Sequence, residues 1–302
     1  MDAETKQQVM ANLFPAARPA VEPWDRFPWH LGRGGKCDSS RPHSAQAMAI
    51  DVFGTLRVAA QGERDAILSA IAHDLGLPEG GPWRVELEWL DPENRLREKR
   101  RTQVDAIAWG RDAVIFFECK FSERDGGECS QPNPLHGGAH DGIVQCDGRY
   151  RMQTNPVNGQ QSRCALAGKG IRYWEVIPQV FRFGAEDVHD PCPFHGPWFQ
   201  WMRNLTLCHE IARTEGLQLA FVIAYADAPH LPFAQRLNSD AWSTLVSALQ
   251  PSAVAFRTIP FQSLVRQAEK CAQAAGARTD VWADLARWVD EKINKVSAAY
   301  AP

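Results

Sequence analysis

Apolar and polar positions follow two different periods along the chain. Apolar residues three and four apart predict helices over residues 43–56 and 63–75. Three strands are then expected at 83–90, 102–109 and 113–121, the last two joined by a tight turn at Gly110. The run that precedes Glu118 is almost entirely apolar, which is typical of a central strand buried on both faces.

Residues 122–196 show neither period. They are rich in Gly, Pro, Asn, Gln and His, and so long an irregular stretch is uncommon in a compact domain unless something organises it. Periodicity then returns, with helices expected at 197–216, 238–249, 261–275 and 279–299 and strands at 217–226 and 252–259. This order predicts an α/β fold with a mixed central β-sheet flanked by helices.

The chain therefore divides into three parts. Residues 1–42, rich in Pro, Gly and Arg after position 14, are expected to form an irregular N-terminal arm. Residues 43–121 and 197–302 are expected to form the α/β core. Residues 122–196 are expected to form an insert in that core.

Composition is typical of a soluble globular protein. Of 302 residues, 44% are hydrophobic and 23% charged, and the formal net charge is −3. No apolar stretch could span a membrane and no signal peptide is visible, so we expect a cytoplasmic protein. Cytoplasmic thiols are usually reduced, so the eight cysteines indicate free thiols or metal ligands rather than disulfides. The net charge excludes a general nucleic-acid coat and permits a local basic surface.

Candidate catalytic residues lie on the second and third strands. Glu118 and Lys120 are two residues apart and share one face of a strand, while Cys119 points to the other face. The turn at Gly110 folds Asp105 back beside them. Two neighbouring carboxylates in apolar surroundings need a neutralising cation, and Mg²⁺ prefers carboxylate oxygens. A lysine beside them suits phosphodiester hydrolysis, because it can orient a water or stabilise charge on a phosphate.

The alternative is a simple ion pair, since most Glu/Lys pairs two apart on a strand are solvated or paired across strands.

The residues also resemble those of a known superfamily. VDAIAW…AVIFFECKF is similar to the core of the PD-(D/E)XK nucleases, with Asp105, Glu118 and Lys120 at the motif positions and Val104 in place of its proline. More closely, the chain resembles a bacterial family of restriction-endonuclease-like proteins. The motifs that carry this are Phe53-Gly54-Thr55-Leu56, Leu87-Glu88-Trp89, Asp105…Glu118-Cys119-Lys120-Phe121-Ser122-Glu123 and Phe199-Gln200-Trp201-Met202-Arg203-Asn204.

The resemblance implies a restriction-endonuclease-like core and further site residues. It implies Glu88 as an additional metal-site carboxylate, with Glu86 and Glu63 as alternatives. It also implies a role for Gln200 beside the nucleic acid, on a helix that follows the lysine. Asn204 stands where the related pattern has a tyrosine, and a polar residue on an amphipathic helix is the alternative interpretation of Gln200.

The activity implied by the resemblance is Mg²⁺- or Mn²⁺-dependent hydrolysis of DNA, which we expect of an endonuclease. The biological role stays open among restriction, phage defence, repair and an antibacterial effector. Asp105, Glu118 and Glu88 would hold the metal together with the Cys119 carbonyl, and Lys120 would position or activate water. A homodimer or a defence-system partner stays open. Two other functions also stay open: a catalytically silent DNA-binding protein on this fold, and a zinc-organised interaction protein in which the motif match is accidental.

Four of the cysteines, Cys129, Cys146, Cys164 and Cys192, fall in the insert. Metal coordination would organise this segment, and four thiolates suit Zn²⁺ or a [4Fe–4S] cluster. Histidines that could substitute as ligands are His136, His140, His189 and His195. The alternative is four unrelated thiols.

The run RLREKRR at 95–101 is the clearest basic segment. It predicts DNA phosphate contacts by Arg97, Lys99, Arg100 and Arg101. Aromatic residues in the insert, Tyr150, Tyr173 and Trp174, are candidates for stacking on bases. The alternative for the basic run is a solvated charged turn.

Overall fold

Strand β3 lies at the centre of the sheet, and all eight of its residues are buried. The computed structural model describes residues 2–250, 254–276 and 280–301. The strands are β1 (Arg84–Leu90), β2 (Gln103–Trp109), β3 (Ala113–Lys120), β6 (Gln218–Tyr225) and β7 (Ala255–Pro260), in the order β1-β2-β3-β6-β7. Strands β1 to β3 are antiparallel neighbours, while β6 and β7 run parallel to β3. The predicted mixed sheet is therefore confirmed.

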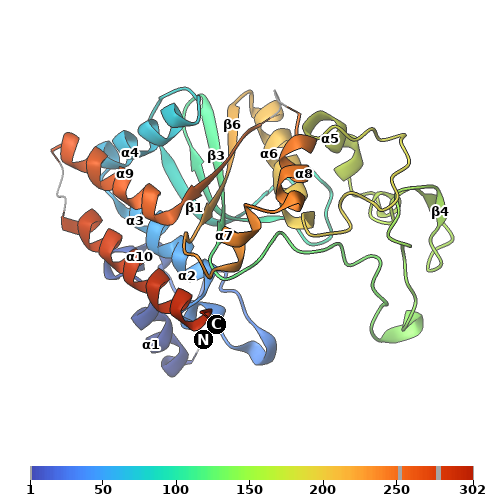
Figure 1. The fold of residues 1–302 in the computed structure, drawn as a ribbon, viewed down its shortest axis with the longest axis horizontal. Helices are drawn as coiled ribbons and strands as arrows, with labels where there is room; N and C mark the ends of the chain where they lie inside the picture. The colour runs from blue at the N-terminus through green and yellow to red at the C-terminus, as the bar shows by residue number, and fades with distance from the viewer. Residues whose placement is uncertain (1, 251–253, 277–279, 302) are drawn as a thin grey trace.

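Helices cover both faces of this sheet (Figure 1). One layer contains α1 (Ala3–Asn12), α2 (Ala45–Ala49), α3 (Thr55–Val58), α4 (Gln61–Asp74), α9 (Phe261–Ala274) and α10 (Asp280–Ala299). The other contains α5 (Tyr173–Val180), α6 (Phe199–Glu215), α7 (Pro232–Arg236) and α8 (Asp240–Ala248). Alternate residues of β3 serve the two layers: Phe117 and Cys119 pack in the first, and Phe116 packs in the second. The predicted flanking helices and the predicted orientation of Cys119 are both confirmed.

The elements of the core match their predicted positions to within a few residues. The helix expected at 43–56 begins after Ser44, whose hydroxyl accepts a bond from the Ala47 N–H, and it continues through a π-helical turn at Ile50–Gly54 to α3. Parts of the strand expected at 252–259 and of the helix expected at 279–299 lie outside the described residues. In the described ranges, no helix is both long and apolar enough to cross a bilayer.

The N-terminal arm is more regular than expected. Residues 3–12 form α1, which begins where the Asp2 carboxylate accepts a 2.7 Å bond from the Thr5 N–H. A 3₁₀ segment follows at Pro15–Val21. Only Val9 of α1 is buried, so the helix has almost no apolar period by which it could be recognised in the sequence.

The insert has little regular structure and extends away from the sheet on the side of α5 and α6 (Figure 1). Its described elements are the short pair β4 (Gln153–Thr154) and β5 (Gln161–Ser162), the helix α5, and 3₁₀ turns at Gly138–His140 and Ala167–Lys169. Helix α5 was not predicted, because Pro178 stands inside its eight residues and reads as a helix breaker.

The two ends of the insert lie against each other. The Gln200 N–H donates to the Gly126 carbonyl at 2.8 Å, and the Cys129 N–H donates to the His195 carbonyl, also at 2.8 Å. Gly126 packs directly on the Trp201 ring, where a Cβ atom would lie 2.8 Å from the nearest ring carbon. The entry and exit of the insert are thereby fixed to the first turn of α6.

A buried ion pair joins the arm, the π-helical turn and α10. Asp51 is fully buried and accepts bonds from Lys292 Nζ at 2.8 Å, Trp288 Nε1 at 2.9 Å and the Phe14 N–H at 2.7 Å. Because Lys292 is also buried, each charge depends on the other for compensation.

We expect Asp51→Ala to lower the free energy of unfolding by about 3–5 kcal/mol, because it leaves the Lys292 ammonium buried without its counter-charge. Urea unfolding followed by circular dichroism measures this change. The control, Asp290→Ala, removes an exposed 3.2 Å ion pair with Arg266 and should cost less than about 1 kcal/mol. Equal losses in the two variants would contradict the role given to Asp51.

Candidate functional site

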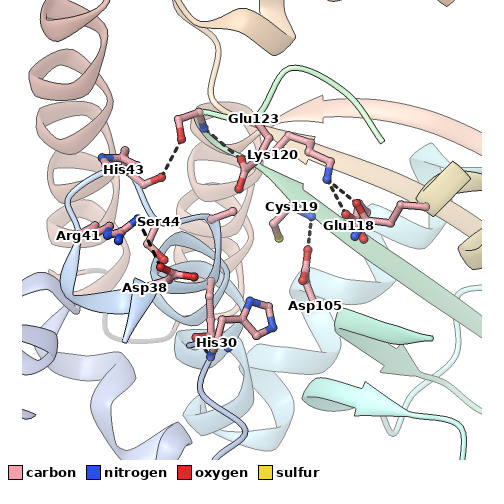
Figure 2. Close-up of a pocket in the computed structure, with 14 residues that line it drawn as sticks. His30, Asp38, Arg41, His43, Ser44, Asp105, Glu118, Cys119, Lys120 and Glu123 are labelled. Carbon is pink, nitrogen blue, oxygen red and sulfur yellow. Dashed lines mark hydrogen bonds and ion pairs between the residues drawn. The ribbon is translucent and has the colours of Figure 1, made fainter. Parts of the chain in front are cut away.

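A pocket of about 330 Å³ opens beside the C-terminal end of β3 (Figure 2). Asp105, Glu118 and Lys120 all line it, from the sheet. The N-terminal arm, the start of α2, the turn after β3 and the first turn of α6 form the rest of the wall, through His30, Asp38, Arg41, His43, Gln46, Glu123 and Gln200. The structure thus brings the three candidate catalytic residues together, and it adds an arm that the sequence did not connect with them.

Strand register explains why the acidic residues gather. It places Glu88, Asp105 and Glu118 in one row across β1, β2 and β3. Regular pairing is interrupted at this row, since Ala106–Phe117 is the last β2–β3 pair and Glu88 is skipped between its paired neighbours. Glu88 has a φ of 52°, a left-handed conformation that is uncommon for glutamate. Of this row, Asp105 and Glu118 line the pocket.

Asp105 carries the electrostatic cost of this arrangement. Burial and the charges of Glu118 and Glu88 raise the pKa of Asp105 well above its usual value. One oxygen, Oδ2, accepts a 2.7 Å bond from the Cys119 N–H, which opposes that rise. Ionisation of Asp105 is therefore less favourable than that of a solvated aspartate, and a nearby cation would oppose this effect.

Glu118 and Lys120 form a buried ion pair. Lys120 Nζ lies 2.7 Å from Glu118 Oε1, and the lysine is 4% and the glutamate 1% exposed. Helix α6 completes the pair: Asn204 Nδ2 donates to Glu118 Oε2 at 2.7 Å, and Lys120 Nζ donates to Gln200 Oε1 at 3.1 Å. Although burial favours the neutral amine, the charges of Glu118 and Glu123 raise the pKa of Lys120 above its usual value, so Lys120 is an ammonium.

Glu88 is held by neutral donors and by the arm. Gln46 Nε2 donates to its Oε1 at 2.7 Å, and Gln103 Nε2 donates to its Oε2 at 2.5 Å. His30 Nε2 lies 3.0 Å from the same Oε2, and this contact with Glu88 raises the pKa of His30 against the opposing effect of burial. The left-handed glutamate is thus fixed from both sides.

The two alternatives to Glu88 lie elsewhere. Glu86 forms an ion pair with Arg84 at 3.1 Å, beside a separate pocket at the far edge of β1. Glu63 accepts a 2.5 Å bond from Trp282 Nε1 and lines another pocket. Of the three glutamates, Glu88 is the one in the row with Asp105.

The donor chemistry suits a hard divalent cation, because three carboxylates share a row and ionisation of Asp105 is unfavourable without one. Within the ranges that the structure describes, no three His, Cys, Asp or Glu side chains are arranged to hold a metal ion. Instead, the carboxylate oxygens of Glu118 accept hydrogen bonds from Lys120 and Asn204. Those of Glu88 accept hydrogen bonds from Gln46 and Gln103. A shift of Lys120 away from Glu118 Oε1 would free an oxygen for a cation.

The basic run divides into two groups. Arg95 is bound to Asp91 at 2.5 Å and to Glu215 at 2.5 Å, with its side chain only 9% exposed, so it has a structural role. The other four, Arg97, Lys99, Arg100 and Arg101, are exposed.

The aromatic residues of the insert are not available to bases, contrary to expectation. Tyr150 and Trp174 stack on each other with ring centroids 3.5 Å apart, and both are buried. Tyr173 is also buried and donates its hydroxyl to Glu98, which Arg203 contacts at 2.9 Å. These rings form the core that attaches the insert to α6.

The four insert cysteines lie around one small pocket, which His195 also lines. Burial, the largest effect, and the neighbouring cysteines raise the pKa of Cys129 to about 11 and that of Cys192 to about 12. Of the other candidate ligands, His189 stacks with Tyr150 instead. Cys37, Cys119 and Cys208 are buried in the apolar layers, as expected of packing residues.

A family model described as "Restriction Endonuclease associating with ARP" matches residues 25–286. The chain belongs to this family of restriction endonucleases. The curated proteins and the solved structures contain no match to it. In this restriction-endonuclease family member, the matched range begins before His30, so it includes the segment of the arm that contacts Glu88.

Several residues that bond to the carboxylates of Glu88 and Glu118 were missed by reasoning from the sequence. Asn204 had a readable signal, because residues four apart share a helix face and Gln200 was already a candidate. Gln46, Gln103 and His30 had none, since each reaches Glu88 only through the tertiary fold.

The carboxylate row predicts that Asp105→Asn raises thermal stability in EDTA at pH 8. A folded-state pKa above the unfolded value means that stability is lost as pH rises through the folded pKa. Asparagine avoids this loss and keeps an oxygen for the Cys119 N–H, so its unfolding midpoint should be about 2–4 °C higher, or about 1 kcal/mol. Scanning calorimetry from pH 8 downward should show the difference shrinking as the pH approaches about 4.

Asp112→Asn, an exposed carboxylate in the β2–β3 turn, is the matched control and should leave the midpoint unchanged. Excess Mg²⁺ should raise the midpoint of the unsubstituted protein more than that of Asp105→Asn. A variant less stable than the parent in EDTA would show that Asp105 is not under electrostatic strain.

Proposed function

We propose that this protein is a Mg²⁺-dependent PD-(D/E)XK endonuclease that hydrolyses phosphodiester bonds in DNA. The observation that carries the proposal is the presence of Asp105, Glu118 and Lys120 in one pocket at an interrupted row of the sheet. Membership of a restriction-endonuclease family supports the same reaction class. A cytoplasmic role in restriction or defence fits that family.

Asp105 and Glu118 would hold the metal, with Glu88 and the Cys119 carbonyl as further oxygen ligands. Bound Mg²⁺, or Mn²⁺ in its place, would polarise a phosphoryl oxygen and make a water more acidic. The protein's own contribution is a row of carboxylates whose mutual repulsion favours a divalent cation at this place over solvent.

Lys120 acts as a hydrogen-bond donor. Its ammonium is paired with Glu118 and bonded to Gln200, so it holds its proton instead of accepting one from water. From this position it orients the attacking water or stabilises negative charge on the scissile phosphate. Gln200 and Asn204 position the pair from α6, each through one bond.

The exposed part of the pocket wall suits the DNA backbone. Arg41, at the end of the arm, and His43, just before α2, both line the pocket (Figure 2), and both are exposed. Arg41 is only loosely paired with Asp38, at 3.5 Å. A phosphate that enters the pocket would meet these side chains first, before it reaches Lys120.

Cleavage of supercoiled plasmid and of single-stranded DNA tests the proposal. We expect Mg²⁺- or Mn²⁺-dependent cutting that EDTA abolishes, and a loss of about 10²–10³-fold in rate for Lys120→Ala, because a preorganised donor to the phosphate or water is removed. Lys270→Ala, an exposed lysine on α9, is the matched control and should cut at the parent rate. Gel densitometry of nicked and linear products measures these rates.

Two outcomes would reject this proposal. Cutting that survives Lys120→Ala would place the reaction elsewhere or assign it to a contaminant. DNA binding without cutting at any metal concentration would favour the catalytically silent DNA-binding protein on the same fold.

We also propose that Arg97, Lys99, Arg100 and Arg101 contact DNA phosphates. Replacing all four with alanine in the Lys120→Ala background should weaken DNA binding and reduce the slope of log K against log salt by up to about 0.9 for each phosphate that is no longer neutralised. Fluorescence anisotropy over a salt series measures both quantities. The matched control replaces four exposed cations on α9 and α10, namely Arg266, Lys270, Arg287 and Lys295. Equal slopes for the two quadruple variants would show that the basic run is only a solvated turn.

A further inference from the structure

The insert has too little regular structure to explain its fixed shape. Between the end of β3 and the start of α6, the described chain contains one eight-residue helix, a pair of two-residue strands and short 3₁₀ turns. Its aromatic core lies around Tyr150 and Trp174, next to α5. The segments that carry the cysteines need a separate source of order.

Four separate segments of the insert each bring one cysteine to the same pocket. Cys129 follows the entry, Cys192 precedes the exit, and Cys146 and Cys164 come from the chain between them. Backbone bonds hold the segments together, from Cys129 to the His195 carbonyl at 2.8 Å and from Cys192 to the Gly148 carbonyl at 2.9 Å. The convergence is thus a property of the fold and not of sequence proximity.

Tight turns fix the backbone next to two of the cysteines. The Gly168 N–H donates to the Cys164 carbonyl at 2.9 Å, and the His195 N–H donates to the Cys192 carbonyl at 3.0 Å. Hydrogen bonds around the ligands of a metal site hold them in position.

Basic side chains surround the same pocket. Arg149 and Arg163 line it, and Lys169 is close enough to interact electrostatically with Cys129 and Cys164. Four thiolates around a divalent cation carry a net charge of about −2. Arg149 and Arg163 are paired with Asp190 at 3.3 Å and with Glu186 at 3.2 Å, both on the surface of the insert. Together with Lys169, they would offset part of the negative charge of the thiolates.

We propose that Cys129, Cys146, Cys164 and Cys192 bind a single zinc ion as thiolates, and that this ion orders the insert. The pocket has a volume of about 30 Å³, which is enough for about one or two water molecules. A four-iron cluster with its sulfides is larger than this. Among divalent ions, zinc accepts four tetrahedral thiolates, with Zn–S bonds of about 2.3 Å. The described side chains do not yet surround one point, so binding includes a change of rotamer at one or more cysteines.

The zinc site shares no lining residue with the pocket at Lys120. It would stabilise the segments that end at the first turn of α6, where Gln200 N–H meets the Gly126 carbonyl. Metal content can therefore be tested without any measurement of DNA cleavage, and either proposal can fail while the other holds.

Elemental analysis of the untagged, full-length protein is the first test. We expect about one zinc ion per chain after dialysis against metal-free buffer. Cys129→Ser and Cys164→Ser should each lower the zinc content several-fold and speed tryptic cleavage within residues 122–196, as should a strong chelator acting on the parent protein. Cobalt added to the metal-stripped parent should give the visible absorption of a tetrahedral tetrathiolate complex.

Cys271→Ser is the matched control, because Cys271 is a half-buried cysteine on α9, far from the insert in sequence and in a different layer. It should keep the full zinc content and the parental proteolysis pattern. Parent protein purified without stoichiometric zinc and unable to bind added zinc or cobalt would overturn the proposal, as would iron with acid-labile sulfide in place of zinc. The elemental and cobalt measurements use the parent chain, so the test does not depend on the folding of any variant.

Discussion

Three carboxylates in one row of a central sheet are the constraint on which the functional half of this molecule depends. The register of β1, β2 and β3 places Glu88, Asp105 and Glu118 in one row, although regular pairing is interrupted there, and like charges close together are unfavourable when buried. Each carboxylate therefore needs its own hydrogen-bond donors, which come from different parts of the chain. Donors to Glu88 come from the arm and α2, the donor to Asp105 is a backbone N–H of β3, and donors to Glu118 are Lys120 and a side chain of α6.

The pocket lies where regular pairing of the sheet stops. Glu88 has a left-handed backbone, Ala106–Phe117 is the last β2–β3 pair, and Asp105 and Glu118, just beyond that pair, line the pocket. Both helical layers contact the polar residues around this row: Gln46 of the first layer donates to Glu88, and Gln200 of the second accepts from Lys120. Polar contacts to the acidic row, as well as apolar packing, thus fix the positions of the two helical layers on the sheet.

The strands and the acidic pair were predictable because they depend on local rules. Alternation placed Glu118 with Lys120 and opposite Cys119, and the turn at Gly110 implied that Asp105 returns beside them. Helices α1 and α5 were not predictable, since one has a single buried residue and the other contains Pro178. The donors to Glu88 are set by contacts between segments far apart in the chain, for which periodicity carries no signal.

Because the two ends of the insert are bonded to each other, the length of the insert can change without changing the geometry of the core. Gly126 and Gln200 are already joined, so the segment between them is a closed loop whose entropic cost grows only logarithmically, by about 0.6 kcal/mol for each doubling. Residues could be inserted, deleted or exchanged within that loop while β3 and α6 keep their places. Evolution can in this way vary the outer surface of the protein while the acidic row stays unchanged.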